Sequence, residues 1–377
     1  MNDSTKYVGM DVSKEKIAVA VADGNSRESA RYWGEIPHRI EDIRKLMKRL
    51  GDVEQLQVCY EAGPTGYLLE RQLASMGVAC MVVAPSLIPK QPGNRVKTDR
   101  RDAQRLAELH RSAELKPVWV PGEEDEALRD LVRAREDAKE DLLRAKHRLG
   151  KFLMRRGIRE PVGVRAWSAK YRVWLKGLQF DSSALQTTFD EYRLSIEEIE
   201  RRIERLESEI HVQAQESKHG AVIKALQAFR GIQEIAAATM VAEVGSFLRF
   251  AKASQVMAYS GAVPSEHSSG AEVRRGKITK TGNSHLRRIA IECAWSYRYP
   301  AAMSATIKKR QEGLPASVQA IAWKAQIRLH KKYRHLILDK GKSPQIAITA
   351  VARELLGFVW AAACDVERQG LGQASAA

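Results

Sequence analysis

The sequence predicts an α/β N-terminal domain, a helical coiled-coil middle segment and a mainly α-helical C-terminal domain. Three observations support this reading. Strand-length apolar runs alternate with helical patterns before residue 120, two heptad seams follow, and helical spacing dominates the remainder. The chain of 377 residues is long enough for two or three domains. We place their limits at residues 1–122, 123–217 and 218–377.

Short apolar runs in the first domain predict four strands and two helices. The expected strands are residues 7–12, 16–24, 56–63 and 79–85. Leucines at helical spacing predict a helix within residues 66–78, and a second helix is expected over residues 97–111. Strands that alternate with helices indicate a sheet covered by helices.

Four carboxylates recur at the ends of these elements. Asp11 lies inside an apolar strand, Glu61 ends a later strand, and Asp99 and Asp102 share one face of the helix that they begin. Taken singly, each fits a solvated acid, an ordinary strand end or a helix cap. Together they would repel one another unless a cation neutralised them, and Mg²⁺ is the usual cation for phosphate chemistry.

The middle segment carries two heptad seams. Steps of three and four residues separate the apolar side chains of both seams, although Arg135 interrupts the first. The first seam is Leu128, Leu131, Ala138, Leu142, Ala145, Leu149 and Phe152, and the second is Leu185, Phe189, Tyr192, Ile196, Ile199, Ile203, Leu206 and Ile210. The seams would pair either within one chain or between chains, and the sequence does not separate these alternatives.

Basic and aromatic residues alternate in the connection between the two long helices, residues 155–177. Cations for phosphates and flat rings for stacking are typical of RNA-binding surfaces. Packing of the tryptophans on the coiled coil is an equally good explanation. The candidate nucleic-acid contacts are Arg165, Trp167, Lys170 and Arg172.

The C-terminal domain contains a glycine turn and a concentrated run of positive charge. Residues 226–245 are similar to a helix-hairpin-helix, whose turn can bind a DNA phosphate, although a plain helix corner fits as well. Residues 271–290 contain six Lys or Arg residues and only one acid, which predicts a phosphate-binding surface. The six are Arg274, Arg275, Lys277, Lys280, Arg287 and Arg288.

Composition narrows the class of protein further. The net charge of +16 favours a polyanionic partner, most often nucleic acid. The four cysteines show no paired spacing for zinc or redox chemistry, so we expect reduced core thiols and a cytoplasmic protein. We expect neither a signal peptide nor a membrane span, because the one long apolar stretch near residue 350 contains Arg353 and Glu354.

Several of these segments resemble one known family. The stretches VGMDVSKEKIAVAV, YEAGPTGY and KTDRRDAQRLAEL look like the ribonuclease-H-like (RuvC-like) domain of bacterial DEDD transposases of the insertion-sequence-110 family. The stretches YSGAVPSEHSSG, GKITKTGNSHLRR and GKSPQIAITAVARELLGFVW look like the C-terminal transposase domain of the same family. The resemblance covers nearly the whole chain, in the family's domain order.

This resemblance implies a function and a set of site residues. It implies that Asp11, Glu61, Asp99 and Asp102 bind Mg²⁺, and that Ser269 attacks DNA to form a covalent phosphoserine. Ser268 is adjacent and Ser265 nearby, so the choice of serine stays open. It also implies double-stranded donor and target DNA, a bridge non-coding RNA as guide, and a homo-oligomer (dimer or tetramer) at the bacterial nucleoid, in which the metal site of one chain meets the serine of another.

Three other functions remain as alternatives. A Mg²⁺-dependent structure-specific endonuclease would keep the fold but activate water in place of the serine. A sugar kinase or actin-like ATPase would explain the first strands, but the chain lacks a second glycine-rich phosphate loop and an adenosine motif. A non-catalytic nucleic-acid-binding protein would explain the charge alone. Asp11 and Ser269 separate these possibilities, because only the recombinase needs both.

Overall fold

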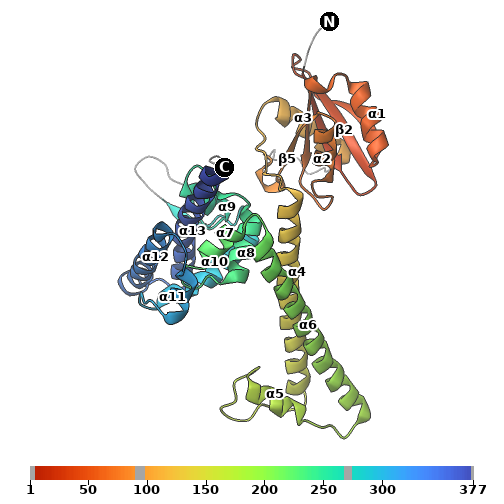
Figure 1. Ribbon diagram of the computed structural model, residues 1–377. Coiled ribbons are helices and arrows are strands. Elements are labelled where there is room, and N and C mark those ends of the chain that lie inside the picture. The colour runs from red at the N-terminus through yellow and green to blue at the C-terminus, as the bar shows by residue number, and fades with distance from the viewer. Residues whose placement is uncertain (1–4, 90–97, 267–273, 375–377) are drawn as a thin grey trace. The chain divides into compact units, whose positions relative to one another are not determined.

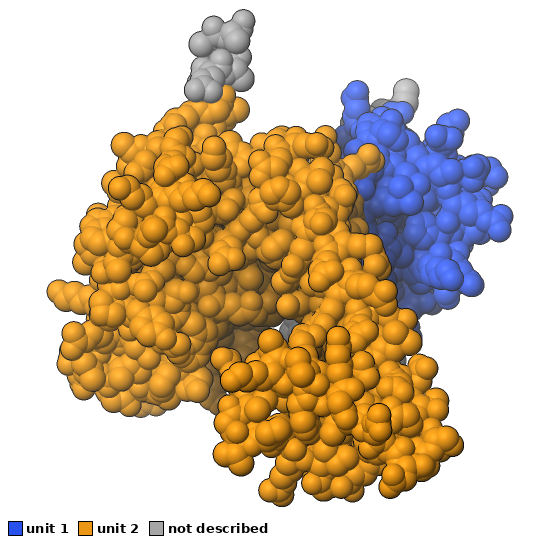
Figure 2. Space-filling model, turned by 60° about the horizontal axis from the view of Figure 1, so that its bottom comes forward, with its two compact units in different colours: residues 1–121 blue, residues 122–377 orange. Residues whose placement is uncertain are grey.

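The computed structural model describes residues 5–89, 98–266 and 274–374. The chain divides into two compact units, residues 1–121 and 122–377, which are coloured separately in Figure 2. The expected middle and C-terminal segments therefore fall together in the second unit. Each unit is described below by itself.

The first unit is built on a mixed five-stranded sheet of order β3-β2-β1-β4-β5 (Figure 1). The pairs β1–β2 and β2–β3 are antiparallel, whereas β1–β4 and β4–β5 are parallel. The strands are β1 Lys6–Val12, β2 Lys16–Asp23, β3 Arg31–Pro37, β4 Leu56–Glu61 and β5 Ala79–Val83. The helices are α1 Ile40–Leu50, α2 Leu68–Ser75 and α3 Asp99–Arg111, with short 3-10 turns at Val53–Gln55 and Pro85–Leu87.

Alternation along the strands sends unlike side chains to the two faces of this sheet. One face carries large apolar side chains, such as Val8 and Met10 of β1, which pack with the buried faces of α1 and α2. The other face carries alanines of β2, which pack against Ala103 and Ala107 of α3. Small side chains on this second face allow α3 to approach the sheet closely.

Two elements of the first unit were not expected from the sequence. β3 is an edge strand whose side chains are mostly half-buried or exposed, so it lacks the apolar run of a central strand. α1 buries Ile43, Leu46, Met47 and Leu50, whose helical spacing is visible in the sequence and would have predicted it.

The second unit begins with two long helices joined by a short one, α5. α4 and α6 pack along each other, and the two seams contribute to one core that includes Ala145, Leu149, Phe189 and Ile196 (Figure 1). Arg135, which interrupts the first seam, is paired with Glu207 of α6 at 2.6 Å. The seams are thus paired within the chain. The bounds are α4 Glu123–Met154, α5 Ala169–Lys176 and α6 Ser183–Glu216.

A helical core fills the rest of the second unit. Its longest helix, α13, is apolar and long enough to cross a membrane, but its buried residues, such as Ile348 and Leu355, lie in this core. The helices are α7 Gly220–Leu226, α8 Glu234–Val244, α9 Ala253–Tyr259, α10 Ser284–Ala294, α11 Ala305–Gln311, α12 Ala316–Arg334 and α13 Pro344–Ala374. Short turns are Phe247–Arg249, Trp295–Arg298 and a π-helical His335–Asp339, and β6 Pro264–Glu266 pairs with β7 Arg275–Ile278.

The glycine turn between α7 and α8 is a tightly packed corner. Gly231 has a φ of +83°, and a Cβ there would lie 2.5 Å from the backbone oxygen of Cys293 and 2.6 Å from Oγ of Ser296. One side of the turn is therefore buried against the end of α10. A plain corner between two helices is sufficient to explain this glycine. Binding of a DNA phosphate at the turn stays a prediction.

Candidate catalytic site

The sheet places Asp11 and Glu61 on the face that α3 covers. Gly9 contacts α3, and Asp11 follows two residues later on the same face of β1. In β4, Cys59 donates to the backbone oxygen of Leu106 in α3, so Glu61 also lies on this face. The parallel pairing of Met10 with Tyr60 brings the next residue of each strand, Asp11 and Glu61, to neighbouring positions.

Gly9 fixes how closely α3 approaches β1. A Cβ at this position would lie 2.2 Å from the backbone oxygen of Ala103 and 2.4 Å from the backbone nitrogen of Ala107. Only glycine lets the two backbones come this close. Since Asp102 immediately precedes Ala103, the same contact brings the first turn of α3 to the strand that carries Asp11.

The first turn of α3 carries the other two acids. Oγ1 of Thr98 accepts a hydrogen bond from the backbone of Arg101 and begins the helix. Asp99 and Asp102 follow on one helix face. Asp99, whose side chain is 54% exposed, pairs with Nζ of Lys16 at 3.4 Å.

Lys16 brings a positive charge to this group of acids. Its Nζ also lies 2.9 Å from Oε1 of Glu35 on β3. Hydrogen bonds to Glu35 and Asp99 raise the pKa of Lys16 above its usual value, so the ammonium stays charged at neutral pH. Lys16 therefore competes with any other cation for Asp99.

The four predicted acids thus occupy one end of one sheet face. Among residues 5–89, 98–266 and 274–374, no three His, Cys, Asp or Glu side chains already gather into a metal-binding cluster. The donor set consists of carboxylate oxygens, which suits a hard divalent cation chemically. Metal binding by these residues stays a prediction.

The predicted nucleophile lies in a part of the chain that the structure does not describe. Ser268 and Ser269 fall within residues 267–273, outside the described ranges. Ser265 lies in β6, where its Oγ would meet a Cβ placed on Gly276 of β7 at 2.5 Å. The role of Ser269 therefore rests on the sequence.

Some cations of the basic segment, residues 274–288, make contacts within the protein. Arg287 donates to the backbone oxygen of Ser260 at 2.8 Å, and Arg288 pairs with Glu136 of α4 and with Glu292. These two arginines therefore have structural partners. The side chains of Arg274, Lys277 and Lys280 are exposed, whereas that of Arg275 lies outside the description.

Some of the candidate nucleic-acid contacts around α5 also have partners within the protein. Arg172 makes two hydrogen bonds to Glu200 of α6, at 2.8 and 2.7 Å, and Trp167 is half-buried against Tyr171. Arg165 and Lys170 are exposed. The packed ring of Trp167 supports the structural interpretation of this segment. The exposed cations Arg165 and Lys170 support the RNA-binding interpretation.

A buried carboxylate that the sequence analysis missed lies in the second unit. Glu243 of α8 has no exposed surface. Arg133 of α4 donates two hydrogen bonds to it at 2.8 and 2.9 Å, and Asn283, which caps α10, donates a third at 2.6 Å. Burial alone would raise the pKa of Glu243, but these hydrogen bonds hold it below its usual value. In the sequence, the only sign of this buried carboxylate was that Glu243 interrupts the apolar run of α8.

Comparison with known proteins identifies the family. A family model described as a transposase of the DEDD and IS110 type matches residues 8–156, and the model of the IS116/IS110/IS902 transposase family matches residues 223–308. A putative transposase of Sinorhizobium fredii, y4qE, is 44% identical over 96% of this chain and 89% of its own length. The transposase for insertion sequence IS1533 of Leptospira borgpetersenii is 36% identical over 88% of this chain and 96% of its own length.

The two matched spans contain the residues of both candidate sites. The DEDD-type match includes all four acids on the α3 face, and the second match includes the β6–β7 segment and its basic residues. A domain of the DEDD class implies a ribonuclease-H-like fold, and such domains generally use divalent metal ions. The chain belongs to the IS110 family of insertion-sequence transposases, enzymes that cut and rejoin DNA.

Proposed function

We propose that this transposase moves its insertion sequence through a covalent phosphoserine intermediate, with Mg²⁺ held by Asp11, Glu61, Asp99 and Asp102. The observation that carries the proposal is the placement of all four carboxylates at one end of one sheet face, where Gly9 lets α3 approach. Carboxylate oxygens are the ligands that a hard divalent cation such as Mg²⁺ prefers.

The proposed reaction needs no ATP, because a serine–phosphate bond replaces each DNA bond that is broken. The hydroxyl oxygen of Ser269 attacks the phosphorus of the scissile phosphodiester, and a serine–phosphate bond replaces the bond to the DNA oxygen that leaves. The serine proton goes to that leaving oxygen. A DNA hydroxyl later attacks the phosphoserine and restores both the phosphodiester and the serine. The bound metal would supply positive charge where negative charge develops on the phosphate.

A bridge RNA is the proposed guide. Its support is the net charge of +16 together with the family resemblance of the whole chain. Base pairing would then select donor and target DNA, while the protein binds backbones and shape. The same resemblance supports a homo-oligomer at the nucleoid.

Covalent trapping tests the proposal. Purified protein, the RNA flanking its gene, Mg²⁺ and labelled target DNA are mixed and separated under denaturing conditions. We expect a protein–DNA adduct that requires both RNA and Mg²⁺ and is lost with Ser269→Ala or Asp11→Asn. Ser265→Ala is the matched control, because this serine faces Gly276 in the described strand pair and its loss should spare the adduct.

Three results would each contradict one part of the proposal. If cleavage survives Ser269→Ala and no adduct forms, the chain acts as a metal-dependent endonuclease in which water is the nucleophile. If Ser268→Ala abolishes the adduct and Ser269→Ala does not, the nucleophile is the neighbouring serine. Adduct formation in the absence of RNA would contradict guidance.

A further inference from the structure

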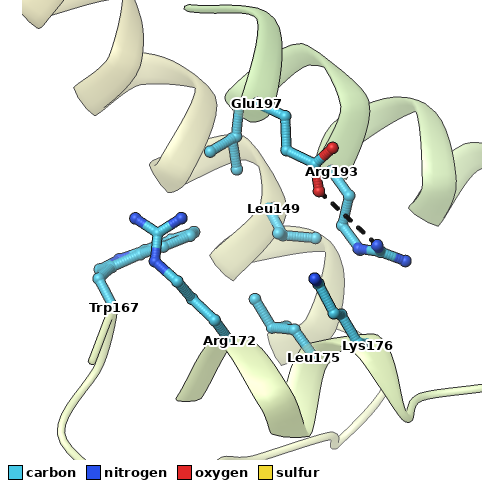
Figure 3. A pocket seen from close by; sticks show the side chains of 8 residues that line it. Leu149, Trp167, Arg172, Leu175, Lys176, Arg193 and Glu197 are labelled. Atoms are coloured by element: carbon cyan, nitrogen blue, oxygen red, sulfur yellow. Dashed lines mark ion pairs between the residues drawn. The ribbon is translucent and has the colours of Figure 1, made fainter. Parts of the chain in front are cut away.

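A pocket of about 300 Å³ lies between the two long helices and the short helix that joins them. Leu149 of α4 lies at its base, Arg172 and Lys176 come from α5, and Arg193 and Glu197 come from α6 (Figure 3). Trp167, just before α5, forms a wall. Its volume is at the lower end of the range for small-molecule sites. Below it is called the α5 pocket.

The base of the α5 pocket is apolar and buried. Leu149, Leu175 and Ile196 line it, and their exposed fractions are 0%, 5% and 3%. All three belong to the core that holds α4, α5 and α6 together. The floor of the pocket is therefore the edge of a packed helical core.

The aromatic wall is held in a strained conformation. Trp167 has a φ of +66°, a left-handed value that is uncommon for a bulky residue. Nζ of Lys146 lies 4.9 Å from its ring centroid, and the ring of Tyr171 lies 5.3 Å away. Strain of this kind persists only where surrounding contacts maintain it, and it is frequent at ligand sites.

Three cationic side chains line the pocket, and carboxylates pair with two of them. Glu200 fixes the guanidinium of Arg172 through two hydrogen bonds, so this plane is preorganised. Arg193 pairs at longer range with Asp190 at 3.4 Å. It also pairs with Glu197 at 3.8 Å, as the dashed line in Figure 3 shows. Lys176 is exposed and makes no ion pair within the described parts of the chain.

We infer that the α5 pocket binds one unpaired nucleotide of a single strand, with its base against Trp167 and the apolar floor and its phosphate toward Lys176 and Arg193. An aromatic wall, an apolar floor and a cationic rim match the three parts of a nucleotide. The Glu197 carboxylate can accept a hydrogen bond from a base amino group. A base inside a duplex cannot enter, because it remains stacked.

This inference rests on the proposed function only in taking nucleic acid as the partner. It adds that recognition at the α5 pocket depends on base stacking and not on charge alone. RNA and DNA single strands share this chemistry, so separate arms of the experiment distinguish them.

Binding of labelled oligonucleotides to the full-length protein tests the inference. Short single-stranded RNA, single-stranded DNA of the same sequence and the RNA duplex are titrated at several salt concentrations. Trp167→Gly removes the ring at a backbone position where glycine is unstrained, so folding should be retained. We expect it to weaken single-strand binding about tenfold, with an unchanged salt dependence, because stacking releases no counterions. Trp167→Phe should restore most of the affinity.

A matched pair of lysine variants separates the pocket from general charge. Lys176→Gln should weaken single-strand binding and lower the slope of log affinity against log salt by roughly one. Lys139→Gln removes the same charge from an exposed position of α4 outside the pocket and should have a smaller effect. Circular dichroism checks the fold of each variant.

Two outcomes would overturn the inference. One is single-strand affinity in Trp167→Gly equal to that of the unmodified protein; the other is an equal loss for single strands and duplex. A stronger effect on RNA than on DNA would assign the site to RNA. The covalent adduct assay is independent: if Trp167→Gly still forms the adduct at saturating RNA, the proposed function stands whatever happens to the pocket.

Discussion

Replacement of Gly9 by alanine should separate α3 from β1 and disable the transposase. The added Cβ would lie 2.2 Å from the backbone oxygen of Ala103 and 2.4 Å from the backbone nitrogen of Ala107. Contacts below 3 Å at a Cβ force a neighbour to move. Here the neighbours are backbone atoms in the middle of a helix, so α3 as a whole must shift.

The expected magnitude follows from the cost of overpacking a core. Inserting one methyl group into a close-packed interior costs about 1–3 kcal/mol. For a unit of 121 residues, this corresponds to a fall in Tm of roughly 3–15 °C. The catalytic effect should be larger, because a displacement near 1 Å at a catalytic group lowers rates by roughly 100-fold. The shift moves Asp99 and Asp102 away from Asp11 and Glu61.

Thermal unfolding and the covalent adduct assay measure the two effects on the same preparation. Gly150→Ala is the matched control: this glycine lies within α4, and a Cβ there meets nothing within 4 Å. It should keep full activity and gain up to about 1 kcal/mol of stability. If Gly9→Ala kept normal adduct formation and an unchanged Tm, the close approach of α3 would not be needed to hold the acids.

Three further predictions concern other groups. Glu243→Gln should lower the free energy of unfolding by about 3 kcal/mol at neutral pH, because Arg133 loses its buried partner. The pKa of Glu243 is lowered in the folded protein, so its stabilising contribution is present above the unfolded pKa and is lost as pH falls through the folded value. Urea unfolding midpoints of the variant should therefore fall less in acid than those of the unmodified protein. An equal fall would contradict the lowered pKa of Glu243. Lys16→Met should lower the Mg²⁺ concentration at half-maximal adduct formation, because Asp99 loses a competing cation; a higher requirement would mean that Lys16 supports the site. Burial raises the pKa of Cys59 and raises that of Cys293 to about 12, so thiol reagents at pH 8 should label neither until the protein unfolds; labelling of the native protein at the unfolded rate would refute their burial.

Local patterns were sufficient where one segment carries its own signal. The strand positions of Asp11 and Glu61, the helix start at Asp99 and the two heptad seams follow from periods of two and of three to four residues. These periods depend on the backbone geometry of each element and not on its neighbours. The sequence by itself therefore determined which elements carry the four acids, where the seams run, and the transposase resemblance that the family matches confirm.

Only the tertiary structure decided which groups meet across the fold. Nothing local to Gly9 indicates that α3 crosses it, and the partners of Glu243 come from Arg133 and Asn283, which are 110 and 40 residues away. The α5 pocket likewise needs three helices and a strained Trp167. Long-range packing chooses such partners, because each contact depends on how far apart two complete elements settle, and no stretch of sequence encodes that distance alone.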